Sequence, residues 1–131
     1  MQKVNGTSTT MSTLYERLGG EAAVAAAVVR FYEKIMDDAL LAPFFEDVEM
    51  DRLIDKQIAF MTLAFDGPSR YTGRDLRVAH APLVLRGLGD AHFDALRDHL
   101  AATLRELAIA EDAIGEVLTM LETTRQDVLS R

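Results

Sequence analysis

Asp75-Leu76-Arg77-Val78-Ala79-His80 is a short amphipathic segment that ends on a histidine. Pro82 follows two residues later and is expected to break the helix, because proline lacks the backbone N–H that a helix interior needs. A loop at 66–73, which contains Gly67 and Gly73, precedes the segment. A histidine ringed by apolar positions on a short helix can hold an iron atom through one ring nitrogen. If His80 does so, the other helices form a box around the iron; otherwise this is a small acidic helical protein whose function the sequence leaves open.

Helices are predicted on both sides of this segment, because apolar residues recur there at spacings of three and four. Thr13 and Glu16 predict a capping box that opens a short helix, and Gly19-Gly20 ends it. Asp90 is the expected N-cap of a later helix. The longer helices are expected at 21–36, 49–65, 90–107 and 110–129, with a tight turn at Phe44-Phe45. No stretch alternates with period two, so the predicted class is all-α.

Composition and charge restrict the function further. A chain of 131 residues with 49% hydrophobic content is expected to form one packed domain at 12–131, after a disordered tail at 1–11. The net charge of −7 argues against binding nucleic acid or an anionic membrane. The chain contains no cysteine, which excludes disulfides and thiolate metal sites. Without an apolar signal or a membrane-length apolar run, a cytoplasmic protein is expected.

Two polar residues interrupt the apolar faces of separate helices. Tyr32 lies at one edge of the stripe of 21–36, and Gln57 lies in the middle of the apolar face of 49–65. Burying a hydroxyl or an amide without a partner costs about 1–3 kcal/mol. These side chains therefore need each other, a buried water or a ligand. A tyrosine hydroxyl can donate to a polarised dioxygen molecule, and a glutamine can orient that hydroxyl or add a second donor.

Seven motifs then occur in a fixed order along 13–129. They are Gly19-Gly20, Phe31-Tyr32, Phe44-Phe45, Leu53 with Lys56-Gln57 and Phe60, Gly67-Pro68 with Tyr71-Thr72-Gly73, His80, and His92-Phe93. Each motif alone is weak, but their order and spacing together are specific. In these features the sequence resembles a group I truncated haemoglobin, the short globin whose helices form a two-over-two sandwich around a haem.

The resemblance implies a role for each matched residue. His80 matches the proximal histidine that coordinates the haem iron. Tyr32 and Gln57 match the distal tyrosine and glutamine that hold the bound ligand. Phe45 matches an aromatic residue that packs on the haem ring, and Phe60 matches a residue that lines the apolar ligand tunnel of this group.

Other matched positions concern the pocket and the cofactor. Leu53 takes the place where many globins have a distal histidine, which disfavours a resting state with two histidine ligands. Lys56 is expected to contact a haem propionate rather than to bind the iron, although both remain open. The resemblance also places Leu76, Leu96, Leu100 and Leu121 in the pocket. With no cysteine, the haem is expected to be a non-covalent b-type haem.

The remaining polar residues are given structural roles. His92 and His99 lie seven residues apart beside an apolar stripe, without an obvious third ligand, and are interpreted as boundary residues of their helix. Asp37-Asp38 is interpreted as a helix terminator rather than a catalytic carboxylate pair.

The expected function is therefore reversible binding of dioxygen at ferrous haem iron, with carbon monoxide and nitric oxide as further possible ligands. One alternative is nitric oxide dioxygenation, which requires a separate reductase because no flavin or nicotinamide domain is evident. A peroxidase is less favoured, since no distal histidine is present to act as a base. A second alternative is a helical interaction module without haem.

Overall fold

The structure is a computed structural model that describes residues 13–65 and 73–131. The predicted tail, the loop at 66–72 and its motifs Gly67-Pro68 and Tyr71-Thr72 lie outside the described residues. Within the described ranges the chain forms helices and no strand, which confirms the all-α class. The elements are α2 (Leu14–Leu18), α3 (Gly20–Met36), the 3-10 helix η1 (Ala42–Phe45), α4 (Met50–Phe65), α5 (Gly73–Leu85), α6 (Asp90–Glu106), α7 (Glu111–Glu122) and α8 (Arg125–Val128).

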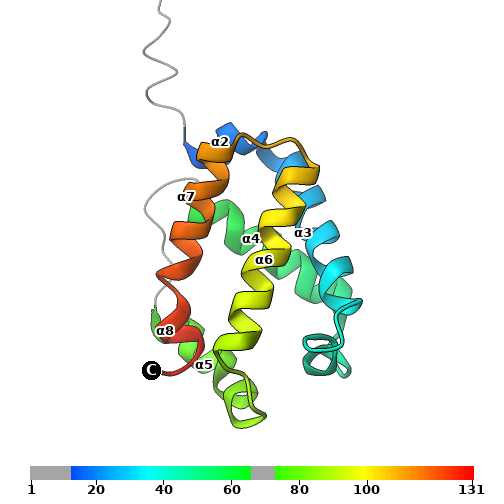
Figure 1. Ribbon diagram of the computed structural model, residues 1–131, viewed down its shortest axis with the longest axis vertical. Helices are drawn as coiled ribbons and strands as arrows, with labels where there is room; N and C mark the ends of the chain where they lie inside the picture. Colours follow the sequence, from blue (N-terminus) through cyan, green and yellow to red (C-terminus); the bar gives the residue numbers. More distant parts are fainter. Residues whose placement is uncertain (1–12, 66–72) are drawn as a thin grey trace, which may run out of the picture.

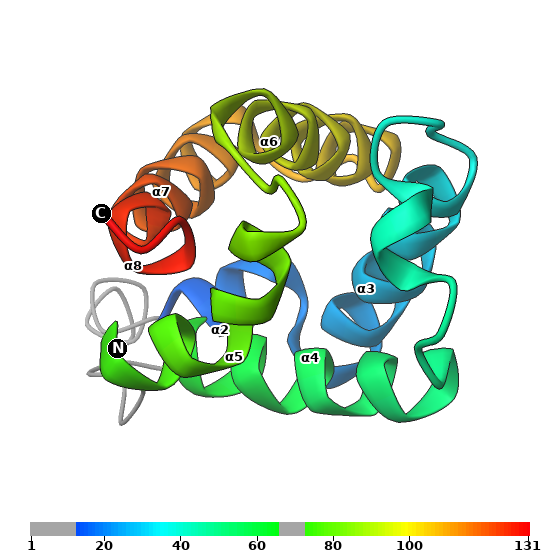
Figure 2. The same cartoon turned by 90° about the horizontal axis from the view of Figure 1, so that it is seen from below.

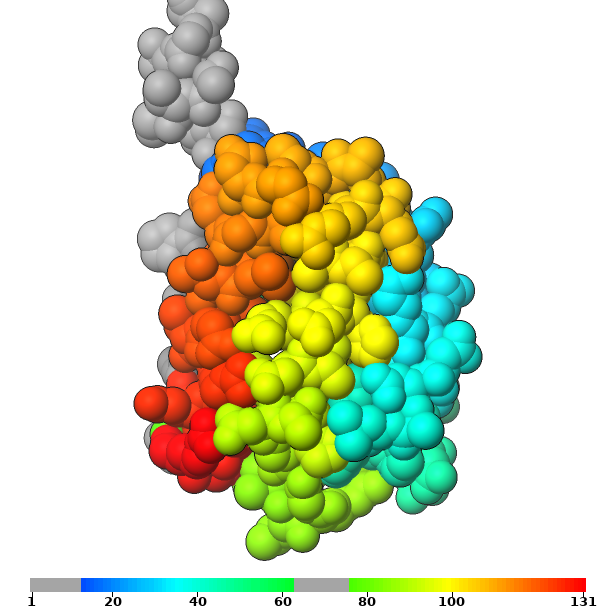
Figure 3. Space-filling model, viewed as in Figure 1, coloured from blue at the N-terminus to red at the C-terminus, as the bar shows by residue number. Residues whose placement is uncertain are grey.

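The long helices form two packed pairs. α3 packs on α4, α6 packs on α7, and contacts between α3 and α6 join the pairs. Figure 1 shows α6 and α7 running side by side, with α4 crossing behind them. Viewed from below, α5 lies between the layer of α4 and the layer of α6 and α7 (Figure 2). In the space-filling view, α6 fills the middle of one face between α7 and α3 (Figure 3). This is a two-over-two helical arrangement.

Apolar residues gather in two clusters. The main core joins α2, α3, α6 and α7, and its most buried side chains include Val28, Ile35, Leu41 and Ile114. The second core is smaller and consists of Phe93, Val128 and Leu129, with Leu76, Leu88 and Leu121 packed against it. No described residue of α5 belongs to the main core, so α5 packs chiefly on α8.

The first helix begins and ends as predicted. The Thr13 hydroxyl accepts a hydrogen bond from the Glu16 amide at 3.1 Å, and the Glu16 carboxylate accepts one from the Thr13 amide at 3.0 Å. The two bonds together form a capping box. Gly19 closes the helix with a φ of 111°, in the left-handed region that glycine adopts without steric cost.

The prediction that Pro82 breaks its helix is wrong, because α5 continues to Leu85 with Pro82 inside it. Because Pro82 has no backbone N–H, the helix lacks only the hydrogen bond that this N–H would donate to the carbonyl of Val78, four residues earlier. Val78 is 70% exposed, so its carbonyl lies on a face that water can reach. The helix ends instead before Gly87, which adopts a φ of 104°.

The predicted helix at 110–129 is also wrong in part, since it consists of α7 and α8 with a break at Thr123 and Thr124. The Thr123 hydroxyl donates to the Met120 carbonyl and the Thr124 hydroxyl donates to the Leu121 carbonyl, both at 2.6 Å. Side-chain bonds of this kind compete with the helical ladder, which explains the interruption.

The N-cap of α6 differs from the prediction by one residue. Gly89, rather than Asp90, is the cap, and its amide donates to Nδ1 of His92 at 3.0 Å. The apolar stripe expected for this helix is present, with Phe93, Leu100 and Leu104 all buried. None of the helices in the described ranges has both the length and the apolarity needed to cross a membrane.

Candidate functional site

Tyr32, which was expected at one edge of the apolar stripe of α3, lies inside the main core and is only 6% exposed. Phe31 and Phe45 meet its ring edge-on, with ring centroids 5.3 Å and 5.9 Å away. Phe45 comes from η1, the short helix that follows the turn after α3. The Tyr32 ring is therefore fixed by aromatic contacts from two elements, as edge-to-face pairs favour.

Gln57 of α4 forms a side-chain hydrogen bond with the Tyr32 hydroxyl. Burial raises the pKa of that hydroxyl above its ordinary value, and the bond to Gln57 lowers it by less. The hydroxyl therefore remains protonated at neutral pH and keeps a proton that it can donate. We refer to Tyr32, Gln57 and Phe45 together as the Tyr32 cluster, which was predicted residue by residue and is brought together here.

His80 lies on α5, in a separate part of the molecule, and is half-buried. Its Nδ1 lies 2.9 Å from the backbone carbonyl of Leu76. A carbonyl oxygen can only accept, so Nδ1 carries a proton, and in the neutral imidazole Nε2 then has a free electron pair. No partner for Nε2 occurs among the described residues. This is the arrangement that metal-ligating histidines use, with the second nitrogen bonded to a backbone carbonyl.

The apolar residues predicted for the pocket divide between the two cores. Leu100 is buried in the main core, and the half-buried residues packed against that core include Phe45, Leu53, Leu96 and Leu121. Leu76 packs instead against the second core, which Leu121 also contacts. Phe60 is half-buried and Lys56 is exposed.

These residues fit a haem. An apolar macrocycle requires apolar side chains on its faces, and its iron requires an unprotonated imidazole nitrogen. Leucines of both cores supply the first, and Nε2 of His80 supplies the second.

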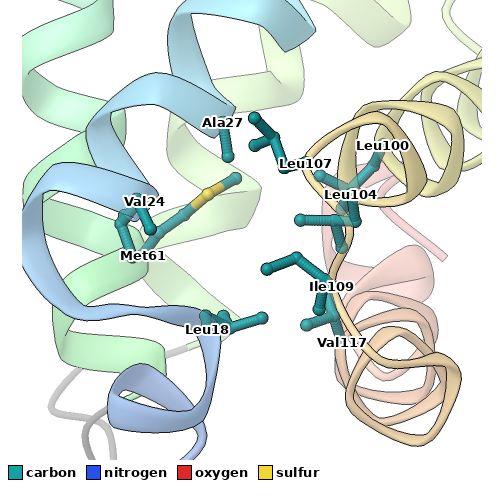
Figure 4. A pocket seen from close by; sticks show the side chains of 10 residues that line it. Leu18, Val24, Ala27, Met61, Leu100, Leu104, Leu107, Ile109 and Val117 are labelled. Carbon is teal, nitrogen blue, oxygen red and sulfur yellow. The ribbon is translucent and has the colours of Figure 1, made fainter.

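An apolar cavity lies between the helices, and of the residues that line it only Leu100 was predicted for the pocket. It measures about 20 Å³, room for one water-sized molecule, and its wall is almost wholly apolar (Figure 4). From α3 it is lined by Ala23, Val24 and Ala27, and from α4 by Met61 rather than Phe60. The small side chains of two alanines opposite leucines were the signal in the sequence. Its other lining residues are Leu18, Leu100, Leu104, Leu107, Ile109 and Val117.

The other two histidines have structural partners. The ring of His92 meets that of Phe44 edge-on at 5.0 Å, which agrees with the expected packing role. Nε2 of His99 lies 2.7 Å from Oδ2 of Asp38, in the turn between α3 and η1. This pair was not predicted, because the two residues are 61 positions apart in the sequence.

Comparison with known proteins finds globins. The model of the bacterial-like globin family matches residues 13–130. The group 1 truncated haemoglobin GlbN of Synechocystis is 45% identical over 124 residues, which cover 92% of this chain and all of that protein. The group 1 truncated haemoglobin of Tetrahymena pyriformis is 40% identical and covers 91% of this chain and 96% of its own length.

Solved structures show the same likeness. The 2/2 haemoglobin of Synechococcus, determined in the cyanomet state with covalently attached haem, superposes with a TM-score of 0.86 at 45% identity, covering 92% of this chain and 100% of that one. The truncated haemoglobin of Tetrahymena pyriformis in its Fe(III) form gives a TM-score of 0.80 at 40% identity, covering 90% and 98% of the two chains.

Proposed function

This chain belongs to the bacterial-like globin family as a group 1 truncated haemoglobin, and from that membership we propose that it binds dioxygen reversibly at the ferrous iron of a haem. The observation that carries the proposal is the Tyr32–Gln57 pair, in which a tyrosine hydroxyl buried in the apolar core is hydrogen-bonded to a half-buried glutamine. Storage of a gas needs such a donor, which can stabilise a polar ligand without admitting water.

Nε2 of His80 is the proposed iron ligand, since Nδ1 is already committed to the Leu76 carbonyl. When bound, the haem supplies an iron with an open coordination position for a diatomic gas. Lys56, which is exposed on α4, is proposed to contact a propionate. The residues proposed to cover the faces of the ring are Phe45, Leu53, Phe60, Leu76, Leu96, Leu100 and Leu121.

The Tyr32 hydroxyl is proposed to donate a hydrogen bond to the gas ligand. Gln57 holds that hydroxyl in place and has a second N–H to offer. Because the ligand becomes negatively polarised, these bonds resemble hydrogen bonds to charged groups, which contribute about 1.5–3 kcal/mol each. Because these hydrogen bonds must break before dioxygen leaves, we expect its release to be slow.

Replacing Tyr32 with Phe tests the proposal. Loss of one such bond should raise the dioxygen dissociation rate about 10- to 100-fold, measured by stopped-flow displacement with carbon monoxide. Tyr15→Phe, at a half-buried tyrosine of α2, is the control and should leave the rate unchanged. An unchanged rate in Tyr32→Phe would remove Tyr32 from the site.

The haem is proposed to be b-type and non-covalent, because the chain has no cysteine through which a vinyl group could be linked. Extraction with acidified butanone should therefore move all of the haem into the organic phase. The polypeptide left behind should have the mass of the sequence alone. A haem adduct on the intact protein would contradict this.

Nitric oxide dioxygenation is a second candidate, and the apolar cavity favours it, because the reaction consumes two gases. Dioxygen, nitric oxide and one electron give nitrate, and a separate reductase must supply the electron. Sustained nitric oxide consumption with nitrate formation in the presence of a flavin reductase would support this activity. A single turnover without recovery would leave gas binding as the function.

A further inference from the structure

Arg86 directly follows α5, at a point where the backbone is held firmly. The backbone amides of Arg86 and Leu88 both donate hydrogen bonds to the carbonyl of Leu83, each at 3.0 Å. Gly87 between them adopts a positive φ of 104°. These bonds form a compact helix end, so the Arg86 side chain extends from a fixed position.

The Arg86 guanidinium contacts η1 in two ways. Nη2 donates to the Pro43 carbonyl at 2.9 Å, and Cζ lies 5.3 Å from the centroid of the Phe44 ring. The second distance is within the range of a cation–π interaction. Phe44 in turn contacts His92, whose Nδ1 accepts the Gly89 amide at the start of α6. One side chain therefore connects the ends of α5, η1 and α6.

This connection joins two elements that carry opposite parts of the proposed haem site. α5 carries His80, and η1 carries Phe45 of the Tyr32 cluster. α5 also packs on α8, and Nε of Arg77 on α5 donates a hydrogen bond to Oδ1 of Asp127 on α8 at 2.8 Å. No described residue of α5 belongs to the main core, against which Phe45 of η1 packs.

We propose that Arg86 is a positioning residue that fastens α5 to η1 across the edge of the haem site, and that this contact sets the rate at which haem is lost. The proposal rests on the proposed function, in that His80 and the Tyr32 cluster lie on either side of the haem. Haem departure requires these two elements to separate, and Arg86 must release Pro43 and Phe44 before they do.

The experiment measures haem transfer from the ferric holoprotein to an excess of haem-scavenging apomyoglobin, followed in the Soret band. Arg86→Gln should lose haem about tenfold faster, the factor that corresponds to about 1.4 kcal/mol. Arg86→Lys, which keeps a donor and a charge but not the planar group, should fall between. The matched control is Arg105→Gln, which has the same charge change at the α6–α7 end, where Arg105 pairs with Glu111.

A second measurement separates positioning from general stability. Thermal unfolding of each holoprotein, followed by far-ultraviolet circular dichroism, should place Arg86→Gln within the range of Arg105→Gln, while only Arg86→Gln loses haem faster. The proposal is overturned if Arg86→Gln keeps the wild-type rate, or if Arg105→Gln accelerates loss equally. If Arg86→Gln does not fold, a wild-type rate in Arg86→Lys overturns it. Failure of the wild type itself to bind haem would instead contradict the proposed function.

Discussion

Tyr32 shows how a polar side chain can be accommodated in an apolar core, with the half-buried Gln57 as its hydrogen-bond partner. The Tyr32 hydroxyl would cost free energy if it were buried without a partner, and the hydrogen bond with Gln57 removes most of that cost. The pair also leaves unused hydrogen-bonding capacity, because a glutamine amide has two donors and a hydroxyl has one. That spare capacity, inside a core closed by Phe31 and Phe45, is what a polar ligand can use.

Gln57→Leu should lower the free energy of unfolding by about 1–3 kcal/mol, because it leaves the Tyr32 hydroxyl buried without its partner. The double variant Tyr32→Phe/Gln57→Leu should lose clearly less than the sum of the two single variants, since it buries no unpaired group. Urea unfolding of the ferric protein gives the four stabilities of this cycle. Strict additivity would show that the two side chains are independent.

The polar residues of the site were predictable singly from the sequence, because each breaks an apolar pattern at a known helical position. Their pairing was only one of three options, since a buried water or a ligand satisfies the same requirement. The His99–Asp38 pair shows the limit more clearly. Helical periodicity places His99 beside the stripe of α6, but only the packing of α6 against the turn after α3 determines which carboxylate it meets.

Two glycines, one at the end of α2 and one inside α7, differ in backbone conformation and in the space around them. A Cβ on Gly19 would lie 2.8 Å from the Cβ of Ala23, in addition to the strain of a φ of 111°. Gly19→Ala should therefore lower the free energy of unfolding by at least about 1–2 kcal/mol. Gly115 lies exposed inside α7 with open space around it, so Gly115→Ala should stabilise the protein by about 0.4–1 kcal/mol. Urea unfolding checks both signs, and equal effects would contradict this reading of the backbone.

Asp38 predicts how the attachment of α6 to the turn before η1 responds to pH. Its carboxylate accepts from His99 at 2.7 Å and from the Leu40 amide at 2.9 Å. The hydrogen bond from His99, followed by that from Leu40, lowers the pKa of Asp38 below its ordinary 3.8. A lowered folded-state pKa means that the ionised group stabilises the fold above 3.8, and that this contribution disappears as the pH falls through the lower value.

Asp38→Asn should accordingly be less stable than the wild type at neutral pH, with a difference that shrinks once the pH falls below 3.8. Urea unfolding of both proteins over this range measures it. Asp98→Asn is the control, because the Asp98 side chain is 76% exposed and its ion pair with Arg97 is long, at 3.8 Å. A difference that grows on acidification has the wrong sign for this account.

Helix boundaries were predicted to different accuracy for physical reasons. The capping box of α2 is local, and both of its bonds form between residues three apart. The continuation of α5 through Pro82 depends on an exposed carbonyl face, and the break between α7 and α8 depends on hydroxyls that bond back to the helix. Apolar spacing alone reports neither.

For the whole molecule, the division into two cores has a dynamic consequence. α5 belongs to the second core and is tied to the rest by few residues, so its stability should depend on the haem more than that of α3 does. Hydrogen exchange with and without haem should show α5 amides losing most of their protection in the apoprotein, while α3 amides lose little. Uniform loss over both helices would mean that the two cores unfold as one unit. Periodicity predicted the stripes of each helix, but assignment of a stripe to one core or the other depends on contacts between distant segments.

We propose that His80 binds the haem iron through Nε2. The absorption spectrum of His80→Gly, recorded with and without added imidazole and compared with that of His92→Gly, tests this bond. We expect that His80→Gly loses the wild-type ferrous spectrum, that imidazole restores it, and that His92→Gly keeps it throughout. A His80→Gly protein with the wild-type ferrous and ferrous–oxygen spectra in the absence of imidazole would contradict the claim.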